Sequence, residues 1–152
     1  MILTEKERTT IQDLMTQEES CRKKYEHSAK QANDNELKSL FERLEKEEQK
    51  HYDSLEQVLN GTCPSCDCND SKGKEYSPKA TYNSLSNAKE KEEDCFLATD
   101  CIGAEKLVSG EYNSNVFNFS EPSVRKLLAD IQIEEQNHAM MLYKYKEVNG
   151  MN

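Results

Sequence analysis

The sequence predicts an all-α protein, an antiparallel four-helix bundle with one long crossover between the second and third helices. Three features predict this fold. Apolar residues recur at helical spacing along four long segments. Charged residues make up 32% of the chain and apolar residues 35%, which suits helices with one buried stripe and a wide solvated face. The stretch 61–77 has loop composition instead, with Gly, Pro, Ser, Asn and three Cys. At 152 residues, the whole chain 1–152 fits a single domain with its own core.

The first two helices are predicted over about 4–32 and 35–60. Thr4 and Glu7 carry the signature of a capping box at the start of the first helix. Asp34 is a suitable N-cap for the second helix, which ends at Asn60-Gly61, a typical helix C-terminus. Because the connection between them is short, these two helices are expected to be antiparallel neighbours.

The third and fourth helices are predicted over about 78–117 and 121–149. Ser77-Pro78 is a favourable N-cap and first-turn pair for the third helix, although a start one or two turns later is the alternative. Ser120 is the expected N-cap of the fourth helix. The crossover 61–77 can extend about 56 Å, while a helix of about 25 residues is about 38 Å long. The crossover can therefore place the third helix parallel to the second. The expected apolar stripe of the third helix consists of Leu85, Ala88, Phe96, Leu97, Ala98, Cys101, Ile102, Leu107, Val108, Tyr112, Val116 and Phe117.

The charge of the chain excludes several classes of partner. A formal net charge of −9 and a pI near 4.9 argue against nucleic acid and anionic membranes. No apolar run approaches the roughly 18 residues that a membrane span needs. The N-terminal stretch Met1–Glu5 lacks the basic and apolar regions of a signal peptide. We therefore expect a protein that folds in the cytoplasm.

A repeat with a spacing of 87 residues organises the polar residues. Adding 87 to Glu18, Tyr25, Glu48 and His51 gives Glu105, Tyr112, Glu135 and His138, so the pattern Glu-x6-Tyr-x22-Glu-x2-His occurs twice without a gap. The apolar positions follow the same repeat, with Leu40, Leu44 and Leu55 matched by Leu127, Ile131 and Leu142. Two helical hairpins related in this way predict a bundle with a pseudo-twofold axis.

The repeat predicts a dinuclear metal site. Residues i and i+3 share one face of a helix, so each Glu-x-x-His pair directs a carboxylate and an imidazole to the same point. Two such pairs, each with one Glu from the preceding helix, are the ligand set of a dinuclear carboxylate centre. Four buried carboxylates would be costly unless two divalent cations neutralised them. The predicted metal ligands are Glu18, Glu48, His51, Glu105, Glu135 and His138.

The chemistry of this ligand set indicates the metal. Mixed carboxylate and imidazole ligands suit two iron or manganese ions, with zinc as a further possible occupant. Glu48 and Glu135 are the natural bridging ligands. We prefer Glu18 to its neighbour Glu19, because the repeat selects it and Glu19 points about 100° away around the helix.

Several other residues near the motifs also need an interpretation. Tyr25 and Tyr112 are either core residues or donors that hydrogen-bond a ligand carboxylate. His27 has no histidine at the repeat position and is expected at the surface. The stretch from Cys63 through Cys66 to Cys68 favours thiol or disulfide chemistry over half of a metal knuckle, because the chain has no second Cys-x-x-Cys.

These motifs resemble the ferritin-like di-iron carboxylate superfamily. The segment Glu18–Tyr25 is similar to the first helix of the rubrerythrin branch, and the two Glu-x-x-His helices resemble that superfamily as a whole. The segments 37–51 and 124–138, with Tyr143-x-Tyr145 and Asn149-Gly150-Met151, are similar to the spore coat protein F-like family. Two departures stand out: the chain ends Met151-Asn152 rather than in an aromatic residue, and it lacks the rubredoxin module of a rubrerythrin.

The resemblance implies two functions. The first is an oxidase- or peroxidase-like di-iron protein that reacts with O2 or H2O2 and protects against oxidative stress. The missing rubredoxin module puts direct peroxidase activity in doubt, because the chain has no built-in electron donor. The second is a structural spore coat component that retains the fold and the metal site. The resemblance also implies a cytoplasmic or spore coat location, and a homodimer or other self-association.

Overall fold

The computed structural model describes residues 1–65 and 71–152, and all regular secondary structure in this part of the chain is helical, without a strand. Its helices are α1 (Glu5–Gln31), α2 (Asn35–Leu59), α3 (Ser71–Glu75), α4 (Ala88–Asn115) and α5 (Pro122–Val148). A 3-10 turn, η1 (Val116–Asn118), follows α4. None of the described helices is long and apolar enough to cross a membrane.

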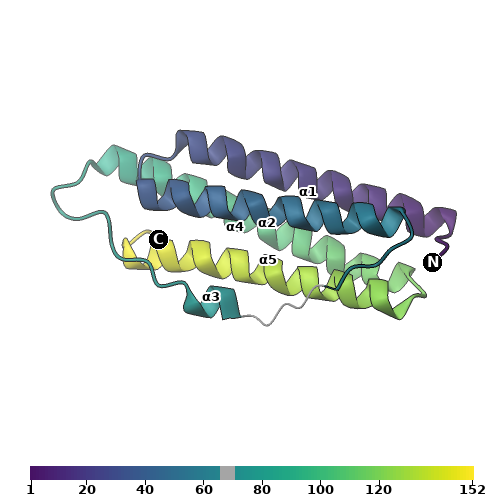
Figure 1. Ribbon diagram of the computed structural model, residues 1–152. Helices are drawn as coiled ribbons and strands as arrows, with labels where there is room; N and C mark the ends of the chain where they lie inside the picture. Colours follow the sequence, from purple (N-terminus) through teal and green to yellow (C-terminus); the bar gives the residue numbers. More distant parts are fainter. Residues whose placement is uncertain (66–70) are drawn as a thin grey trace.

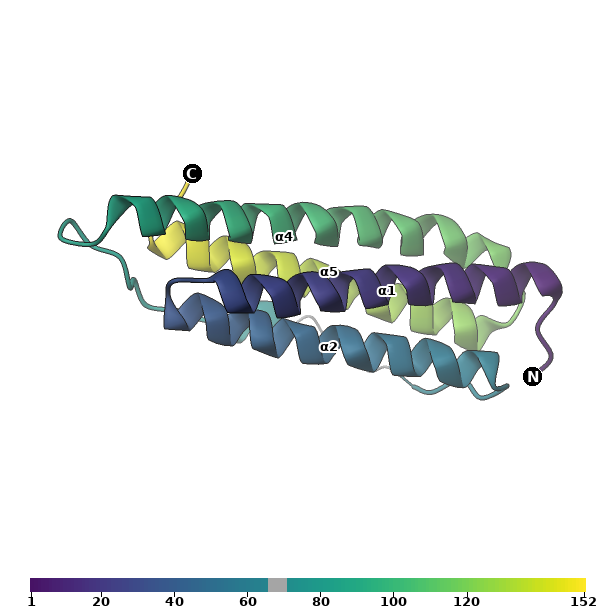
Figure 2. The same cartoon turned by 90° about the horizontal axis from the view of Figure 1, so that it is seen from above.

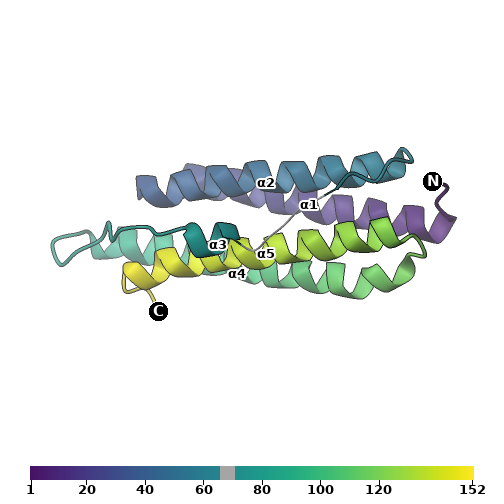
Figure 3. The same ribbon diagram turned by 60° about the horizontal axis from the view of Figure 1, so that its bottom comes forward.

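The four long helices lie side by side along one direction (Figure 1). Most of the helix contacts join α1 to α2 and α4 to α5, so the chain forms two helical pairs. Viewed from above, α4 lies along one outer edge of the molecule (Figure 2). The short α3 packs against α5, on the outside of the second pair (Figure 3).

The helix ends expected around the first pair are confirmed. The Thr4 side chain and the Glu7 backbone and side chain form the complete capping box. The Asp34 side chain accepts from the backbone N–H of Glu36 at the start of α2. At the end of α2, Gly61 has a φ of 91°, a left-handed conformation that glycine adopts without steric cost.

The predicted start of the third helix was wrong. Helix α4 begins at Ala88, and the Ser77-Pro78 pair lies outside it. The Asn87 side chain caps the new start by accepting from the backbone N–H groups of Lys89 and Glu90. Residues 76–87 are non-helical, and Asn149 Oδ1 accepts from the N–H groups of Thr81 and Tyr82 at 2.9 and 3.0 Å. These backbone groups hydrogen-bond to the end of α5 instead of forming a helical turn. Helix α3, inside the predicted crossover, was not expected.

Two further details differ from the sequence prediction. Glu121, not Ser120, is the N-cap of α5, because its carboxylate accepts from the N–H of Ser123. The expected apolar stripe of the third helix also does not lie entirely in the core. Four of its members are largely exposed: Leu85, Phe96, Leu107 and Phe117. Leu85 lies before α4, whereas Phe96 and Leu107 belong to α4 and Phe117 belongs to η1.

The core consists of two apolar clusters separated by a polar layer. One cluster joins the start of α1 and the end of α2 to the start of α5, around Ile11, Leu55 and Leu128. The other joins the end of α1 and the start of α2 to the end of α5, around Phe41 and Leu142. The repeat explains this arrangement, because the matched Leu55 and Leu142 occupy opposite clusters. The predicted metal ligands lie between the two.

Candidate metal centre

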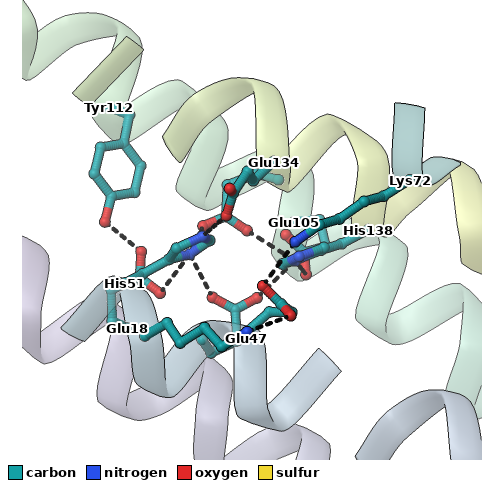
Figure 4. A network of polar contacts seen from close by, with 11 residues as sticks. Glu18, Glu47, His51, Lys72, Glu105, Tyr112, Glu134 and His138 are labelled. Carbon is teal, nitrogen blue, oxygen red and sulfur yellow. Dashed lines mark hydrogen bonds and ion pairs between the residues drawn. The ribbon is translucent and has the colours of Figure 1, made fainter. Parts of the chain in front are cut away.

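All six predicted ligands are buried, and they come from all four long helices. Glu18 extends from α1, Glu48 and His51 from α2, Glu105 from α4, and Glu135 and His138 from α5. None of the six is more than 2% exposed. Figure 4 shows the labelled members of this group turned toward one another across the interior. The sequence prediction therefore identified side chains that share one polar layer.

Three carboxylates surround the Nδ1 atom of His51. Glu135 Oε1 lies 3.1 Å away, Glu48 Oε2 3.3 Å and Glu18 Oε2 3.6 Å. A neutral imidazole has at most one proton on this nitrogen, so it cannot satisfy three carboxylates by hydrogen bonding. A cation between the nitrogen and the oxygens would satisfy all of them.

The same geometry occurs around His138. Its Nδ1 atom lies 3.1 Å from Glu48 Oε1, 3.2 Å from Glu105 Oε1 and 3.4 Å from Glu135 Oε2. The two imidazole rings stack with their centroids 5.7 Å apart and their planes 13° from parallel. The two environments are therefore adjacent and similarly built.

Two overlapping donor sets result from this arrangement. Glu18, Glu48, His51 and Glu135 offer ligand atoms within 4.8 Å of one another, and so do Glu48, Glu105, Glu135 and His138. Glu48 and Glu135 belong to both sets, and they are the two residues that the sequence suggested as bridges. Each set combines three carboxylates with one imidazole, a mixture suited to iron, manganese or zinc.

Several carboxylate oxygens in the layer have no hydrogen-bond partner. Among the described residues, the buried side-chain oxygens in this state are Glu18 Oε2, Glu105 Oε2 and both oxygens of Glu135. The approach of His51 Nδ1 to Glu135 lacks hydrogen-bond geometry. Leaving a buried charged oxygen unsatisfied is costly, so buried polar groups are nearly always paired. All four oxygens belong to the two donor sets, which fits a site built for cations.

The pKa values of the two carboxylates that both donor sets share differ in direction from those of the two carboxylates that belong to one set only. Burial and the neighbouring carboxylates raise the pKa of Glu135 to about 8 and raise the pKa of Glu48 well above its usual value. Burial opposes ionisation of Glu18 and Glu105 too. Their neighbouring histidines nevertheless hold the pKa of Glu18 below its ordinary value and that of Glu105 at about 2. Without a metal, the two shared carboxylates therefore retain protons most readily.

Two tyrosines hold the unshared carboxylates. The Tyr25 hydroxyl on α1 donates to Glu105 on α4, and the Tyr112 hydroxyl on α4 donates to Glu18 on α1. Each tyrosine thus bonds the glutamate of the other helical pair. Burial and these carboxylates raise the pKa of both phenols, so both remain hydrogen-bond donors. Of the two readings of these tyrosines, the structure supports the hydrogen bond to a candidate ligand.

Glu134 is a member of the site that the sequence reasoning did not single out. Its Oε2 atom is hydrogen-bonded to His51 Nε2, on the far side of the ring from the carboxylates. Such a bond fixes the orientation and tautomer of an imidazole ligand. The repeat offered a signal, because Glu47 and Glu134 immediately precede the two Glu-x-x-His glutamates. Glu47 instead accepts from Lys50 at 3.0 Å and from Lys72 of α3 at 3.2 Å.

The structure tests the sequence predictions for Glu19 and His27 but not the prediction for the cysteines. Glu19 lies outside the layer and forms ion pairs with Lys23 and Arg22. His27 is exposed on α1, as expected. Cys63 is half-buried, but Cys66 and Cys68 lie outside the described residues, so the thiol prediction stays a prediction.

A surface groove leads to one side of the polar layer. It lies between α4 and α5, has a volume of about 420 Å³ and is mainly apolar. Ile102, Met140 and Tyr143 line it, while Glu105 and Glu135 lie at its inner end. A small molecule in this groove would therefore approach the second donor set.

The comparisons with known proteins point to one family domain. A family model described as the Coat F domain matches residues 93–151. The match spans most of α4 and all of α5, so it includes Glu105, Glu135 and His138 but not the predicted ligands on α1 and α2. No curated protein and no solved structure matches the chain.

Proposed function

We propose that this protein is a Coat F-like helical protein that binds two divalent metal ions in its core. The observation that carries the proposal is the pair of donor sets that share Glu48 and Glu135. Two divalent ions would supply four positive charges to four buried carboxylates. Their presence would also satisfy the oxygens that have no hydrogen-bond partner.

Each metal would have its own terminal ligands. Glu18 and His51 would hold one ion, and Glu105 and His138 would hold the other. Glu48 and Glu135 would bridge the two. Tyr25 and Tyr112 would position the terminal carboxylates, and Glu134 would orient His51 through its second nitrogen.

The biological role that the family match favours is a spore coat component. Under this proposal the whole chain 1–152 is one domain, a ferritin-like four-helix bundle in which the connection between α2 and α4 is the crossover. The match of the Coat F domain to residues 93–151 supports a coat location and association with other copies or coat proteins. In this role the metal ions would stabilise a bundle whose core otherwise contains mutually repelling carboxylates.

A second candidate function is oxidation chemistry at the same site. The bound metal ions, if iron, would supply electrons to O2 or H2O2. The groove that reaches Glu105 and Glu135 favours this candidate, because it gives a small molecule a path to the layer. Repeated turnover would require a reductant that returns the metal ions to the ferrous state.

One experiment tests the proposal and separates the two candidates. The purified protein is loaded anaerobically with Fe²⁺, Mn²⁺ or Zn²⁺. The number of metal ions bound per chain is then measured by elemental mass spectrometry. Two ions per chain support the metal site, and absence of stoichiometric metal contradicts it. Oxygen consumption by the Fe²⁺-loaded protein, compared with a Glu135→Ala variant, then decides the second candidate. Two bound ions without oxygen or peroxide turnover would leave the coat role as the function.

A further inference from the structure

The outer face of α4 carries large apolar side chains that nothing in the described structure covers. Phe96 is 68% exposed, Leu107 is 76% exposed, and Phe117 in η1 is 86% exposed. The helix is apolar on its inner face as well, where Leu97, Val108 and Tyr112 are buried. A helix that carries large apolar side chains on both sides, here among exposed charged residues on the outer side, usually has a partner on each side.

Two glycines lie on the same face, and packing within the described structure does not require a glycine at either position. Gly103 and Gly110 are exposed, and a Cβ atom added to either would meet nothing within 4 Å. Glycine in the middle of a helix costs about 1 kcal/mol relative to alanine. Internal packing therefore does not explain their presence in the middle of α4. A second backbone that approaches this face closely would explain it.

The spacing on this face is self-complementary. In a twofold antiparallel pairing of two α4 helices, residues whose numbers add up to 213 lie opposite each other. This register places Phe96 opposite Phe117, and Gly103 opposite Gly110. It also places Thr99 opposite Ser114. Asp100, which already pairs with Lys24 at 2.8 Å, lies opposite Asn113. None of these pairs brings two like charges together.

The dimensions of the face suit a small dimer interface. From residue 96 to residue 117 the helix is about 32 Å long. With the neighbouring side chains of α5 or α1, a strip about 20 Å wide could be covered, because packed helices lie about 10 Å apart. Such a strip corresponds to roughly 600 Å² on each partner, near the lower end of specific protein interfaces. α4 lies along an outer edge of the molecule, where a second copy has access (Figure 2).

We propose that the outer face of α4 is a homodimer interface, in which α4 packs antiparallel against α4 of a second copy about Lys106 and Leu107. The occupant is a second copy because the same register pairs the aromatic residues and the glycines simultaneously. At the twofold axis, Leu107 of each copy would lie against the alkyl chain of Lys106 of the other. This inference rests on the association with other copies that the proposed function includes, names the surface that would carry it, and does not depend on metal binding.

Because Leu107 lies at the twofold axis in this register, substitutions at position 107 test the proposal sensitively. A Leu107→Lys change would bring four lysines together at the axis, whereas Leu107→Glu would place two glutamates against two lysines. Like charges in an interface cost several kcal/mol, and each 1.4 kcal/mol is tenfold in affinity. We expect Leu107→Lys to weaken the dimer at least about 100-fold and Leu107→Glu to weaken it far less. Light scattering with size-exclusion chromatography, over a range of concentrations, measures both.

Two further variants control this test. Leu85→Lys adds the same charge at an exposed leucine outside α4 and should leave the dimer unchanged. Gly103→Ala should raise the melting temperature of the isolated chain but weaken the dimer, which separates association from folding. Wild-type protein that stays monomeric at about 100 μM would overturn the proposal. Equal weakening by Leu107→Lys and Leu107→Glu would overturn it too, as a partner other than a second copy in this register would then cover the face.

Discussion

The helical pairs α1–α2 and α4–α5 carry the same polar groups 87 residues apart, yet they have different surroundings. In the interior they are nearly equivalent, since each gives one tyrosine, two glutamates and one histidine to the polar layer. Outside the layer they diverge. The second pair has an exposed apolar face on α4 and is covered by α3, which sends Lys72 to Glu47. The buried layer is thus nearly symmetric, while in the described part of the chain the exposed apolar side chains of the long helices lie on the second pair.

The largest expected effect concerns the near-equivalence of the two helical pairs in the interior of the bundle. Glu135 belongs to both donor sets and Glu105 to one. We expect Glu135→Ala to abolish binding of both ions and Glu105→Ala to leave about one ion per chain. At a metal concentration of 100 times the Kd, each bound ion stabilises the fold by about 2.7 kcal/mol. Each ion therefore raises the melting temperature by about 5–11 °C, and Glu135→Ala should lose the increase from both ions.

The matched variant for this prediction is Glu18→Ala in the first pair. It should resemble Glu105→Ala in the number of ions retained, because the repeat relates the two positions. Metal-free Glu135→Ala should melt no lower than metal-free wild type, since the change removes a buried carboxylate that has no hydrogen-bond partner. If Glu135→Ala retains both ions, the shared role of Glu135 is refuted.

The second effect is a dependence on pH that both pairs should share. The raised pKa values of Glu135, about 8, and of Glu48 mean that metal must displace protons from the shared carboxylates. Affinity should therefore fall about tenfold per pH unit below pH 8 for each displaced proton. Titration with Mn²⁺ or Zn²⁺ at several pH values measures this slope. A flat affinity between pH 8 and pH 6 would contradict the protonation of these groups.

The metal-free protein should show the opposite trend in stability. The folded pKa of Glu135 lies above the unfolded value of 4.5, so the folded state binds the extra proton between these values. Stability from this group is present at pH 4.5 and is lost as the pH rises toward 8. The raised pKa values of His51 and His138 act in the same direction. The melting temperature of the metal-free protein should thus decline from pH 5 to pH 8, and saturating metal should remove the decline.

The third expected effect concerns a difference between the two helical pairs, namely the partners of Glu134 and Glu47. Glu134 is bonded to His51, while Glu47 is bonded to Lys50 and Lys72. Loss of a carboxylate that orients a metal-bound histidine typically weakens binding about 10–100-fold. We expect this loss for Glu134→Gln at the first metal position only, and a smaller change for Glu47→Gln. Competition titrations with a chelating dye compare the two variants, and equal losses would mean that Glu47 orients His138.

Sequence and structure agree in the interior because burial there follows the repeat. The positions of Glu18 and Tyr25 recur at Glu105 and Tyr112, and few positions fit a pattern matched twice by chance. Outside the layer the same reasoning failed. Helical periodicity could not show that Phe96 lies on the outer face, because α4 is apolar on both sides. The Ser77-Pro78 signal was local, whereas the start of α4 depends on distant bonds to Asn149.

The smallest expected effect returns to the symmetry of the layer. Tyr25 and Tyr112 each donate to a terminal carboxylate of the opposite pair, so Tyr25→Phe and Tyr112→Phe remove equivalent bonds. Because neither tyrosine belongs to the donor sets, each change should retain two ions and weaken only one of them, by about tenfold, the lower end of the range for such partners. Tyr25→Phe should affect the ion held by Glu105, and Tyr112→Phe the ion held by Glu18. Stepwise metal titration of the two variants separates these positions, and a loss of both ions in either variant would show that the phenol supports the whole layer rather than one carboxylate.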